Sequence, residues 1–507
     1  MVDVAIIGGG HNGLVAASYL AKAGLTVRLF ESGEHLGGAT ASERVFEGID
    51  AKLSRYSYLV SLLPDQIVQE LGLNFETISR RISSFTPYKS KDGGDQGLLI
   101  SNDWSEAKDA FSSLGLETDA HAWRNFYDQI ASVAPAIAGT FLSPLPTRSE
   151  MKELIGSEAF DLLFTTPLGN TLTDRFDGDR VRGIVLTDGL IGTFTDAFDP
   201  GLLANRCFLY HLVGNGDGQW KVPRGGMGAL VEELRRVALS LGVRIETNRR
   251  VESIDGGSIH LEGERVDARF IVAACSPSEL ARLRGRESKI AATQGSQVKI
   301  NMVLRRLPRL RSGIDPQDAF AGTFHIDESF DQLQRAFHSA KSGSLPDPIP
   351  AEIYCHTLTD PSILSPELAA AGYQTLTLFA LHTPYDLFTS DNERVKREVQ
   401  RRLLAQINSY LIDSIEECLA RDAHGALAIE IKSPIDLEAE IGLPRGNIFH
   451  ADLTFPWRED HEGIRWGCET EDENIFLAGA GSRRGGGVSG IGGQNAAMAI
   501  LERLSLD

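Results

Sequence analysis

Cysteine is scarce in this sequence, and the few residues present lie far apart. They are Cys207, Cys275, Cys355, Cys418 and Cys468. No two of them form a C-x-x-C pair, which argues against a zinc site and against a thioredoxin-like redox pair. We therefore expect no metal site, and the odd number of cysteines fits a reducing compartment.

Long apolar stretches are also missing. No run of about 18 apolar residues is present, so no transmembrane segment is expected. The first predicted strand begins at Val2, which leaves no room for a signal or transit peptide. These absences predict a cytoplasmic protein, with peripheral membrane contact left open.

Positive charge is in deficit. The chain has 50 Lys and Arg against 69 Asp and Glu, a formal net charge of −19, and no basic cluster. Proteins hold the phosphates of nucleic acids, and the anionic lipids of membranes, largely through Lys and Arg. The composition therefore predicts no nucleic-acid partner and no docking on lipid through a general basic surface.

What the sequence does have is a nucleotide-type unit in its first forty residues. Val2 to Ile7 is a short apolar strand, Asn12 to Ala23 has helical spacing, and Thr26 to Phe30 is a second strand. Strand, glycine-rich turn, helix and strand follow in the order of a dinucleotide-binding βαβ unit.

The turn carries the spacing Gly8-x-Gly10-x-x-Gly13, and Glu31 follows about 20 residues on. Gly8 is expected to make the tight turn, Gly10 to let a pyrophosphate approach, and Gly13 to let the helix pack on the strand. The helix N-terminus offers free N–H groups to the anion, and Glu31 would accept hydrogen bonds from a ribose diol. The neighbouring residues predicted to bind the cofactor are His11, Asn12 and Ser32.

A second glycine pair identifies the nucleotide. An acid at the end of the second strand favours FAD or NAD over NADP. Gly37 and Gly38, followed by Ala39 and Thr40, would let a flavin's ribityl and pyrophosphate region lie against bare backbone, which NAD sites do not need. The predicted cofactor is FAD.

The length of 507 residues requires more than one domain. Nucleotide-type patterns occupy 1–75, 219–288 and 441–507, which predicts one discontinuous FAD-binding domain. Residues 76–218 are predicted to be largely helical, and 289–440 to contain an antiparallel sheet, together forming a substrate or cap domain. The fold class is α/β: a Rossmann-type (GR2-like) FAD-binding domain with an inserted α+β substrate domain.

Four motifs carry a family resemblance: GGGHNGLVAASYLAKAG, WKVPRGGMGAL, GNIFHADL and FLAGAGSRRGGGVSGIGGQNAA. With them the whole chain resembles the FAD-dependent phytoene desaturase-like proteins of the amine-oxidase superfamily, in the phytoene-dehydrogenase-related branch. The resemblance implies that Gly37, Gly38, Ala39 and Thr40 line the ribityl path and that Val251 meets adenine. It also implies that the flavin ring and its phosphates lie beside Gly481, Gly487, Val488 and Ser489.

The chain departs from this family at two places. Ala39 stands where an Arg is common, and Ser482-Arg483-Arg484 stands where Thr-His-Pro is common. One hypothesis is that Arg483 or Arg484 faces the pocket and forks onto a substrate carboxylate. The alternative is that both point outward or pair with acids of the protein.

Few catalytic side chains are expected, because a flavin performs the hydride chemistry itself. Lys299, in GSQVKINMVL, resembles the amine-oxidase lysine that holds a water at flavin N5; the alternative is an exposed strand lysine. His211 and His450 are proposed proton carriers or else core histidines. Tyr56 and Tyr58 either line a substrate pocket or pack in the core.

The sequence thus predicts an FAD-dependent oxidoreductase that removes two electrons from a C–C or C–N bond. Its expected partners are a small apolar or amphipathic substrate, which can carry a carboxylate, and oxygen or a quinone as electron acceptor. A redox-neutral isomerase of polyenes and a non-catalytic flavin-binding regulatory protein are the alternatives. The sequence leaves the oligomeric state open.

Overall fold

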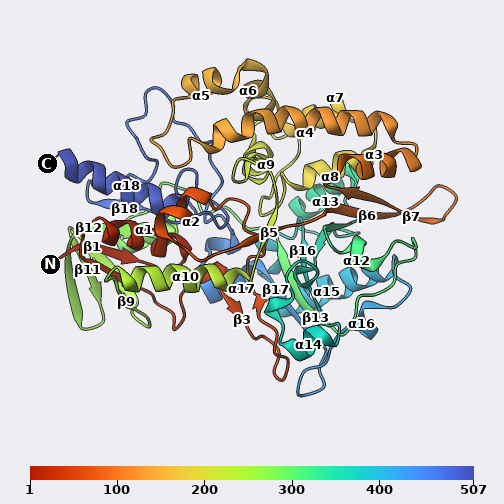
Figure 1. Ribbon diagram of the computed structural model, residues 1–507. Coiled ribbons are helices and arrows are strands. Elements are labelled where there is room, and N and C mark those ends of the chain that lie inside the picture. The colour runs from red at the N-terminus through yellow and green to blue at the C-terminus, as the bar shows by residue number, and fades with distance from the viewer. Residues whose placement is uncertain (507) are drawn as a thin grey trace.

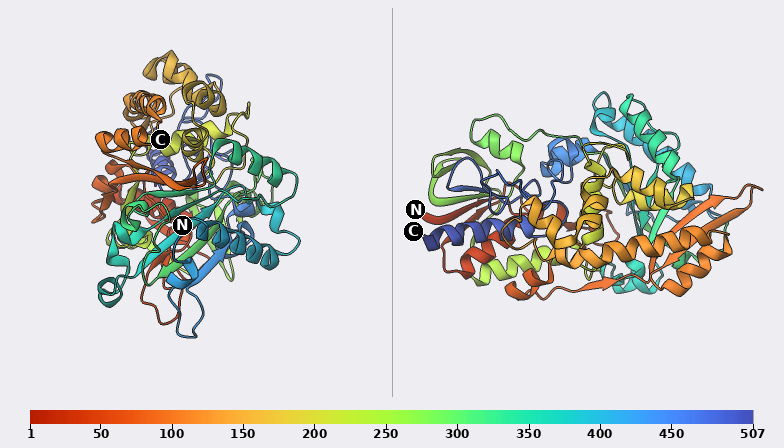
Figure 2. Two further views of the ribbon diagram at one scale, coloured as in Figure 1. Left: turned by 90° about the vertical axis from the view of Figure 1, so that its right-hand side faces the viewer. Right: turned by 90° about the horizontal axis from the view of Figure 1, so that it is seen from above.

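Two seven-stranded sheets organise the chain in the computed structural model, which describes residues 1–506. One sheet lies beside both termini, and the other lies at the opposite end of the molecule (Figure 1). The views in Figure 2 show helices packed around both sheets.

The first sheet is drawn from distant parts of the chain. Its strands are β1 (Val2–Ile7), β2 (Val27–Phe30), β9 (Arg244–Glu246), β10 (Val251–Asp255), β11 (Ser258–Leu261), β12 (Glu264–Ala273) and β18 (Ile475–Leu477). The order is β10-β11-β12-β1-β2-β9, with β18 also paired to β12. β1 runs parallel to β2 and β12, so the centre of the sheet has Rossmann character.

One apolar cluster joins this sheet to the helices α1 (His11–Lys22), α10 (Met227–Ser240) and α18 (Ile491–Leu506). α1 packs against both of the others, which brings the two ends of the chain together. β1 lies at the centre of the sheet, which explains why Val4 to Ile7 are apolar and buried at every position, without alternation.

The second sheet has the order β17-β13-β16-β15-β14-β6-β7. Its strands are β6 (Ile82–Lys89), β7 (Asp95–Ser101), β13 (Val298–Leu304), β14 (Thr323–Ile326), β15 (Ala351–Tyr354), β16 (Gln374–Ala380) and β17 (Ile429–Lys432). The antiparallel pairing predicted for 289–440 is present in β13, β15 and β16.

The prediction that 76–218 is largely helical is borne out from residue 104 onward, but the range also contains strands that were not predicted. Its first part supplies β6 and β7, which join the second sheet, with β6 parallel to β14. β6 shows burial on consecutive residues instead of strict alternation, so the period-two pattern is weak there.

The remaining elements complete the two parts. The helices are α2 (Asp65–Leu71), α3 (Trp104–Ser113), α4 (Glu117–Ala138), α5 (Arg148–Ile155), α6 (Ser157–Phe164), α7 (Leu168–Arg175), α8 (Asp179–Thr187), α9 (Leu203–Val213), α11 (Pro277–Leu283), α12 (Pro316–Ala319), α13 (Phe330–Lys341), α14 (Pro366–Ala370), α15 (Asn392–Asn408), α16 (Ile415–Cys418) and α17 (Pro434–Ile441). The short strands are β3 (Ser42–Glu43), β4 (Leu53–Ser54), β5 (Thr77–Ser79) and β8 (Lys221–Pro223).

The predicted fold class is confirmed by this architecture. A Rossmann-type α/β sheet made of separated segments carries an inserted α+β region with its own sheet and helices. Within residues 1–506 no helix is both long and apolar enough to cross a membrane.

Candidate active site

A cavity of about 860 Å³ is lined by segments from both sheets and both ends of the chain. Its lining runs from the turn after β1, past the glycine-rich loop before α18, to side chains of the inserted region. This size falls within the range of cavities that hold cofactors and other small molecules.

The turn after β1 needs its glycines for steric reasons. Gly8 has φ +102°, a backbone conformation that L side chains rarely adopt. A Cβ atom on Gly13 would lie 2.1 Å from the carbonyl oxygen of Gly8, so only glycine lets α1 pack this closely. At Gly10 the only atom within 4 Å of such a Cβ, among the described residues, is the Gly37 carbonyl oxygen at 3.9 Å. The backbone is bare where Gly10 faces the cavity.

The N-terminus of α1 points its positive dipole end at this turn. Gly10 precedes the helix without a side-chain cap in the described structure. His11 and Asn12 both line the cavity. Thr40 is buried behind them and holds His11, with 3.0 Å between Thr40 Oγ1 and His11 Nδ1. Burial lowers the pKa of His11 to about 4, so this ring is neutral at pH 7.

Glu31 lines the cavity at the end of β2, and its carboxylate is fixed by its own loop. Glu31 Oε2 accepts from the Gly9 N–H at 2.8 Å, and Oε1 accepts from the Gly33 N–H at 2.7 Å and from the Ser32 hydroxyl at 3.2 Å. An ionised carboxylate has about four acceptor positions, so it can still accept hydrogen bonds from a diol.

The second glycine pair packs directly on the first turn. Gly37 and Gly38 have φ values of +116° and +52°, and the Gly37 N–H donates to the Gly9 carbonyl at 3.0 Å. Both glycines and Ala39 line the cavity. Two bare loops therefore lie side by side along one wall.

At the other end of the chain, Gly487 and Val488 line the cavity, and so does Val251 at the start of β10. Gly481 and Ser489 are absent from the lining and support it from behind. A Cβ on Gly481 would lie 2.6 Å from the Pro277 side chain, and Ser489 Oγ accepts from the Ile491 N–H at the start of α18.

Two polar side chains that sequence reasoning missed also face this space. Gln297 is buried and lines the cavity, yet neither its amide nitrogen nor its amide oxygen has a partner within residues 1–506. Ser57 also lines the cavity, and its hydroxyl likewise has no partner within residues 1–506. A buried amide without partners is costly, and it suits a ligand edge that both donates and accepts. Gln297 lies two residues before Lys299 in the segment GSQVKINMVL, but nothing in that segment marks the amide as a ligand.

The two histidines proposed as proton carriers both line the cavity. His211 shares a 2.8 Å contact between its Nδ1 and the Cys207 carbonyl oxygen, and its ring stacks on Trp220 at 5.1 Å. His450 lies at φ +65°, and its Nδ1 has no partner among the described residues. Burial lowers both pKa values to about 4, so both rings are neutral at pH 7.

His450 is also closer to the C-terminal glycine loop than its position in the sequence indicates. A Cβ on Gly481 would lie 3.4 Å from the Cβ of His450, and Cys275 also lines the cavity. The linear sequence has no Cys or His beside this loop, but the fold brings both residue types to it.

Lys299 is buried in β13, with 2% of its surface exposed, so the alternative of an exposed strand lysine is wrong. Its Nζ donates to the carbonyl oxygens of Ser54 at 2.5 Å and Ser57 at 3.1 Å. Burial pushes the pKa of Lys299 well below its ordinary value. Lys299 itself is absent from the lining, but Ser57 and Phe379, whose ring centroid lies 5.3 Å from Nζ, are part of it.

Tyr56 and Tyr58 follow this lysine-bound segment and both line the cavity. The Tyr56 hydroxyl donates to Glu440 at 2.8 Å, which ties the cavity wall to α17. The Tyr58 ring packs on Tyr354 with 4.8 Å between centroids, and burial raises the pKa of Tyr58.

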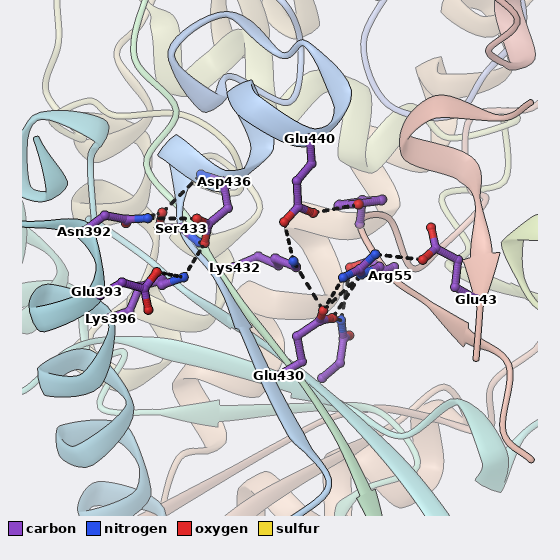
Figure 3. A network of polar contacts seen from close by, with 12 residues as sticks. Glu43, Arg55, Asn392, Glu393, Lys396, Glu430, Lys432, Ser433, Asp436 and Glu440 are labelled. Carbon is purple, nitrogen blue, oxygen red and sulfur yellow. Dashed lines mark hydrogen bonds and ion pairs between the residues drawn. The ribbon is translucent and has the colours of Figure 1, made fainter. Parts of the chain in front are cut away.

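A network of ion pairs joins residues of the same wall (Figure 3). Arg55 lies between Glu43 at 2.7 Å and Glu430 at 2.6 Å. Lys432 lies between Glu430 at 3.3 Å and Glu440 at 2.5 Å. Glu43 and Glu440 line the cavity, and these contacts pair both of them with cations.

Arg483 does not line the cavity. Its guanidinium forks onto the Glu462 carboxylate at 2.8 and 3.0 Å and donates to the Trp457 carbonyl at 2.6 Å. This is the alternative in which the arginine pairs with an acid of the protein.

Arg484 is also absent from the lining and is almost fully buried, with 1% exposure. It donates to the carbonyls of Thr140 at 2.5 Å, Ser143 at 2.6 Å and Trp466 at 2.9 Å. The structure therefore favours the alternative over the hypothesis that Arg483 or Arg484 grips a substrate carboxylate, because both guanidinium groups donate to protein oxygens from distant segments.

These residues fit an extended dinucleotide. The bare glycine backbone, the uncapped helix end and Glu31 suit the phosphates and ribose, and the free Gln297 amide suits a polar ring edge. The aromatic and aliphatic side chains farther along the wall leave room for a second, apolar molecule.

Known proteins agree with this geometry. An uncharacterized protein of Mycobacterium tuberculosis is 43% identical and covers 99% of this chain and 97% of its own length. One of the polypeptides of the limonene dehydrogenase of Castellaniella defragrans is 23% identical over 100% of this chain and 95% of its own. A putrescine oxidase variant with redesigned cofactor binding shares the fold, with a TM-score of 0.60, 19% identity, and coverage of 100% of this chain and 99% of that one.

The family described as flavin containing amine oxidoreductase matches residues 13–400, which is most of the chain. The predicted resemblance to the amine-oxidase superfamily is thereby confirmed, and with it the FAD cofactor and the oxidoreductase class. The chain belongs to the flavin containing amine oxidoreductase family.

Proposed function

We propose that this FAD-dependent oxidoreductase removes two electrons from a C–C or C–N bond of a neutral, largely apolar substrate. The observation that carries the proposal is the apolar character of part of the cavity wall. Leu59, Leu62, Ile191, Phe379, Phe449 and Leu453 line it. Arg483 and Arg484 are directed to protein acceptors, which leaves an anionic substrate without the fork predicted for it.

We further propose that the glycine turn, Glu31 and the second glycine pair hold the nucleotide, with Gln297 and Ser57 at the ring end. When bound, FAD accepts a hydride from the substrate. The chain's own contribution is to orient both molecules and to exclude water. Neutral histidines suit this task, because an imidazolium would attract water into an apolar cavity.

The limonene dehydrogenase polypeptide supports an apolar substrate, because its name assigns that relative an unsaturated hydrocarbon. The electron acceptor, oxygen or a quinone, and the cytoplasmic location remain part of the proposal.

Anaerobic mixing tests the function. We expect the purified protein to be yellow, to release FAD on acid precipitation, and to lose flavin absorbance when mixed with neutral monoterpenes or carotenes. Matched carboxylic acids should be poorer substrates. Conversion of a polyene without bleaching would instead establish an isomerase, and inertness toward every class would leave a regulatory flavoprotein. Flavin that stays with the precipitate would identify a covalent link, for which His450 and Cys275 are the residues to examine.

The Glu31→Ala variant should bind FAD about tenfold or more weakly, because a hydrogen bond to a charged group contributes roughly 1.5–3 kcal/mol. Glu34→Ala is the matched control, since Glu34 is exposed in the same loop and absent from the cavity lining. FAD affinity is measured by titrating the flavin-free proteins and following flavin fluorescence. Equal affinities in the two variants would show that Glu31 serves only its own loop.

A further inference from the structure

A second group of potential ligands lies outside the cofactor cavity. Within residues 1–506, His325, Glu328 and Glu352 form a buried cluster whose ligand atoms all lie within 4.8 Å of one another. His325 on β14 and Glu352 on β15 are directly paired across the antiparallel ladder. Asp327, at φ +52°, turns the chain so that the Glu328 side chain returns to His325.

The distances in this cluster suit a small cation. His325 Nδ1 lies 2.5 Å from Glu328 Oε2 and 4.0 Å from Glu352 Oε1. A divalent ion with bonds of about 2.1 Å places neighbouring ligand atoms about 3–3.5 Å apart. The two observed distances bracket that spacing, so small side-chain rotations are enough to reach it.

The other oxygen of the Glu328 carboxylate has no protein partner within residues 1–506. Glu328 is 2% exposed, and its Oε1 has no hydrogen-bond partner among the described residues. The second oxygen of Glu352, by contrast, accepts from the Tyr354 hydroxyl, the kind of outer contact that orients a metal-bound carboxylate. A cation between the three side chains would satisfy the free oxygen.

The charges around the cluster also favour a cation. His325, Glu352, Asp188 and Arg80 line a neighbouring cavity of about 260 Å³. Arg124 and Asp128 also line this cavity, so with Glu328 four carboxylates stand against two guanidinium groups, which leaves two negative charges when the acids are ionised. The small cavity provides a path for an ion and room for the waters that complete its coordination.

We propose that His325, Glu328 and Glu352 bind one divalent first-row transition metal ion, such as Zn²⁺ or Mn²⁺. One imidazole and two carboxylates are the donor set of such ions, whereas Mg²⁺ and Ca²⁺ prefer oxygen alone. Tyr354 lines both cavities, so the ion would brace the cofactor-cavity wall through Glu352. The proposal is independent of the substrate, and it reverses the expectation of no metal site, which rested on cysteine spacing.

Calorimetric titration of the FAD-loaded, chelator-treated protein with ZnCl2 tests the site. We expect one equivalent to bind the parent protein, and Glu328→Gln to bind it at least about tenfold more weakly. His356→Gln is the matched control, because His356 is a buried histidine with a single carboxylate partner, Asp360, at 3.3 Å. Its metal affinity should equal that of the parent.

No heat of binding in the parent protein, or equal affinity in Glu328→Gln, would overturn the proposal. Because Glu328→Gln can fail to fold, its flavin spectrum is recorded first. Crystals of the FAD-loaded parent soaked with ZnCl2 give a second test that needs no variant. An anomalous peak between the three side chains is expected, and a map without one there would refute the site.

Discussion

Replacing Lys299 with Met should slow one flavin half-reaction by about 10²–10³-fold while FAD remains bound. A group that orders a water or transfers a proton typically contributes about 10²–10⁴-fold in rate. Lys299 Nζ holds the carbonyls of Ser54 and Ser57, and the Ser57 side chain faces the cavity. Methionine has a similar length and no donor, so the variant removes these bonds with little change of volume.

Stopped-flow measurement of bleaching under anaerobic conditions, and then of re-oxidation, separates the two half-reactions. The control is Lys396→Met, because Lys396 is another buried lysine, paired with Glu393 and Asp436, and absent from the cavity lining. If Lys299→Met and the parent protein have the same rates in both half-reactions, Lys299 has a structural role only. A selective loss of kcat at constant KM would indicate the proposed water, and a rise in KM would indicate a displaced Tyr56–Tyr58 wall.

Acidification should destabilise the parent protein by about 3 kcal/mol more than the His382→Asn variant between pH 7.5 and pH 4.5. His382 is 1% exposed, and burial lowers its pKa from 6.5 to about 3. Between these values the unfolded chain binds a proton that the folded chain does not. The contribution of His382 is therefore complete above pH 6.5 and is lost as the pH falls toward 3, at about 1.4 kcal/mol for each pH unit.

Asparagine suits this position because it tolerates the left-handed conformation, φ +53°, that His382 adopts. Urea unfolding of both proteins at the two pH values gives the difference in unfolding free energy. His121→Asn is the control, since His121 is an exposed histidine on α4. A difference between parent and His382→Asn that stays constant with pH would contradict the prediction.

The cofactor end of the protein could be predicted from the sequence because its determinants are local. Gly8, Gly10 and Gly13 fall within one turn, and the conformations that they adopt depend on the absence of Cβ atoms, which the sequence states directly. Glu31 ends the strand next to that turn, so its place at the cavity follows from the βαβ geometry alone.

The strands β6 and β7 of the inserted region were not predicted from the sequence. β6 and β7 gain their stability by joining a sheet whose other strands lie about 200 residues or more away in the sequence. A segment whose two faces are covered by such distant partners needs no regular alternation of its own.

Only the tertiary structure decided where the charged and polar side chains point. The sequence allowed Arg484 to contact a substrate, but in the structure its guanidinium donates hydrogen bonds to the carbonyl oxygens of Thr140, Ser143 and Trp466. Gln297 and His450 acquired their place at the cavity from elements far apart in the chain. A buried charged group needs hydrogen-bonding or oppositely charged partners, and the packing of distant segments determines which partners lie near it.

Sites built from neighbouring residues differ in this respect from sites built from distant segments. The sequence by itself determined the nucleotide turn, because backbone conformation depends on neighbouring residues. The tertiary structure alone decided the His325, Glu328 and Glu352 cluster and the burial of Lys299, because each depends on register between strands or on segments distant in sequence. Pairing energies between such segments accumulate over whole sheets and cannot be assigned to any one stretch of residues.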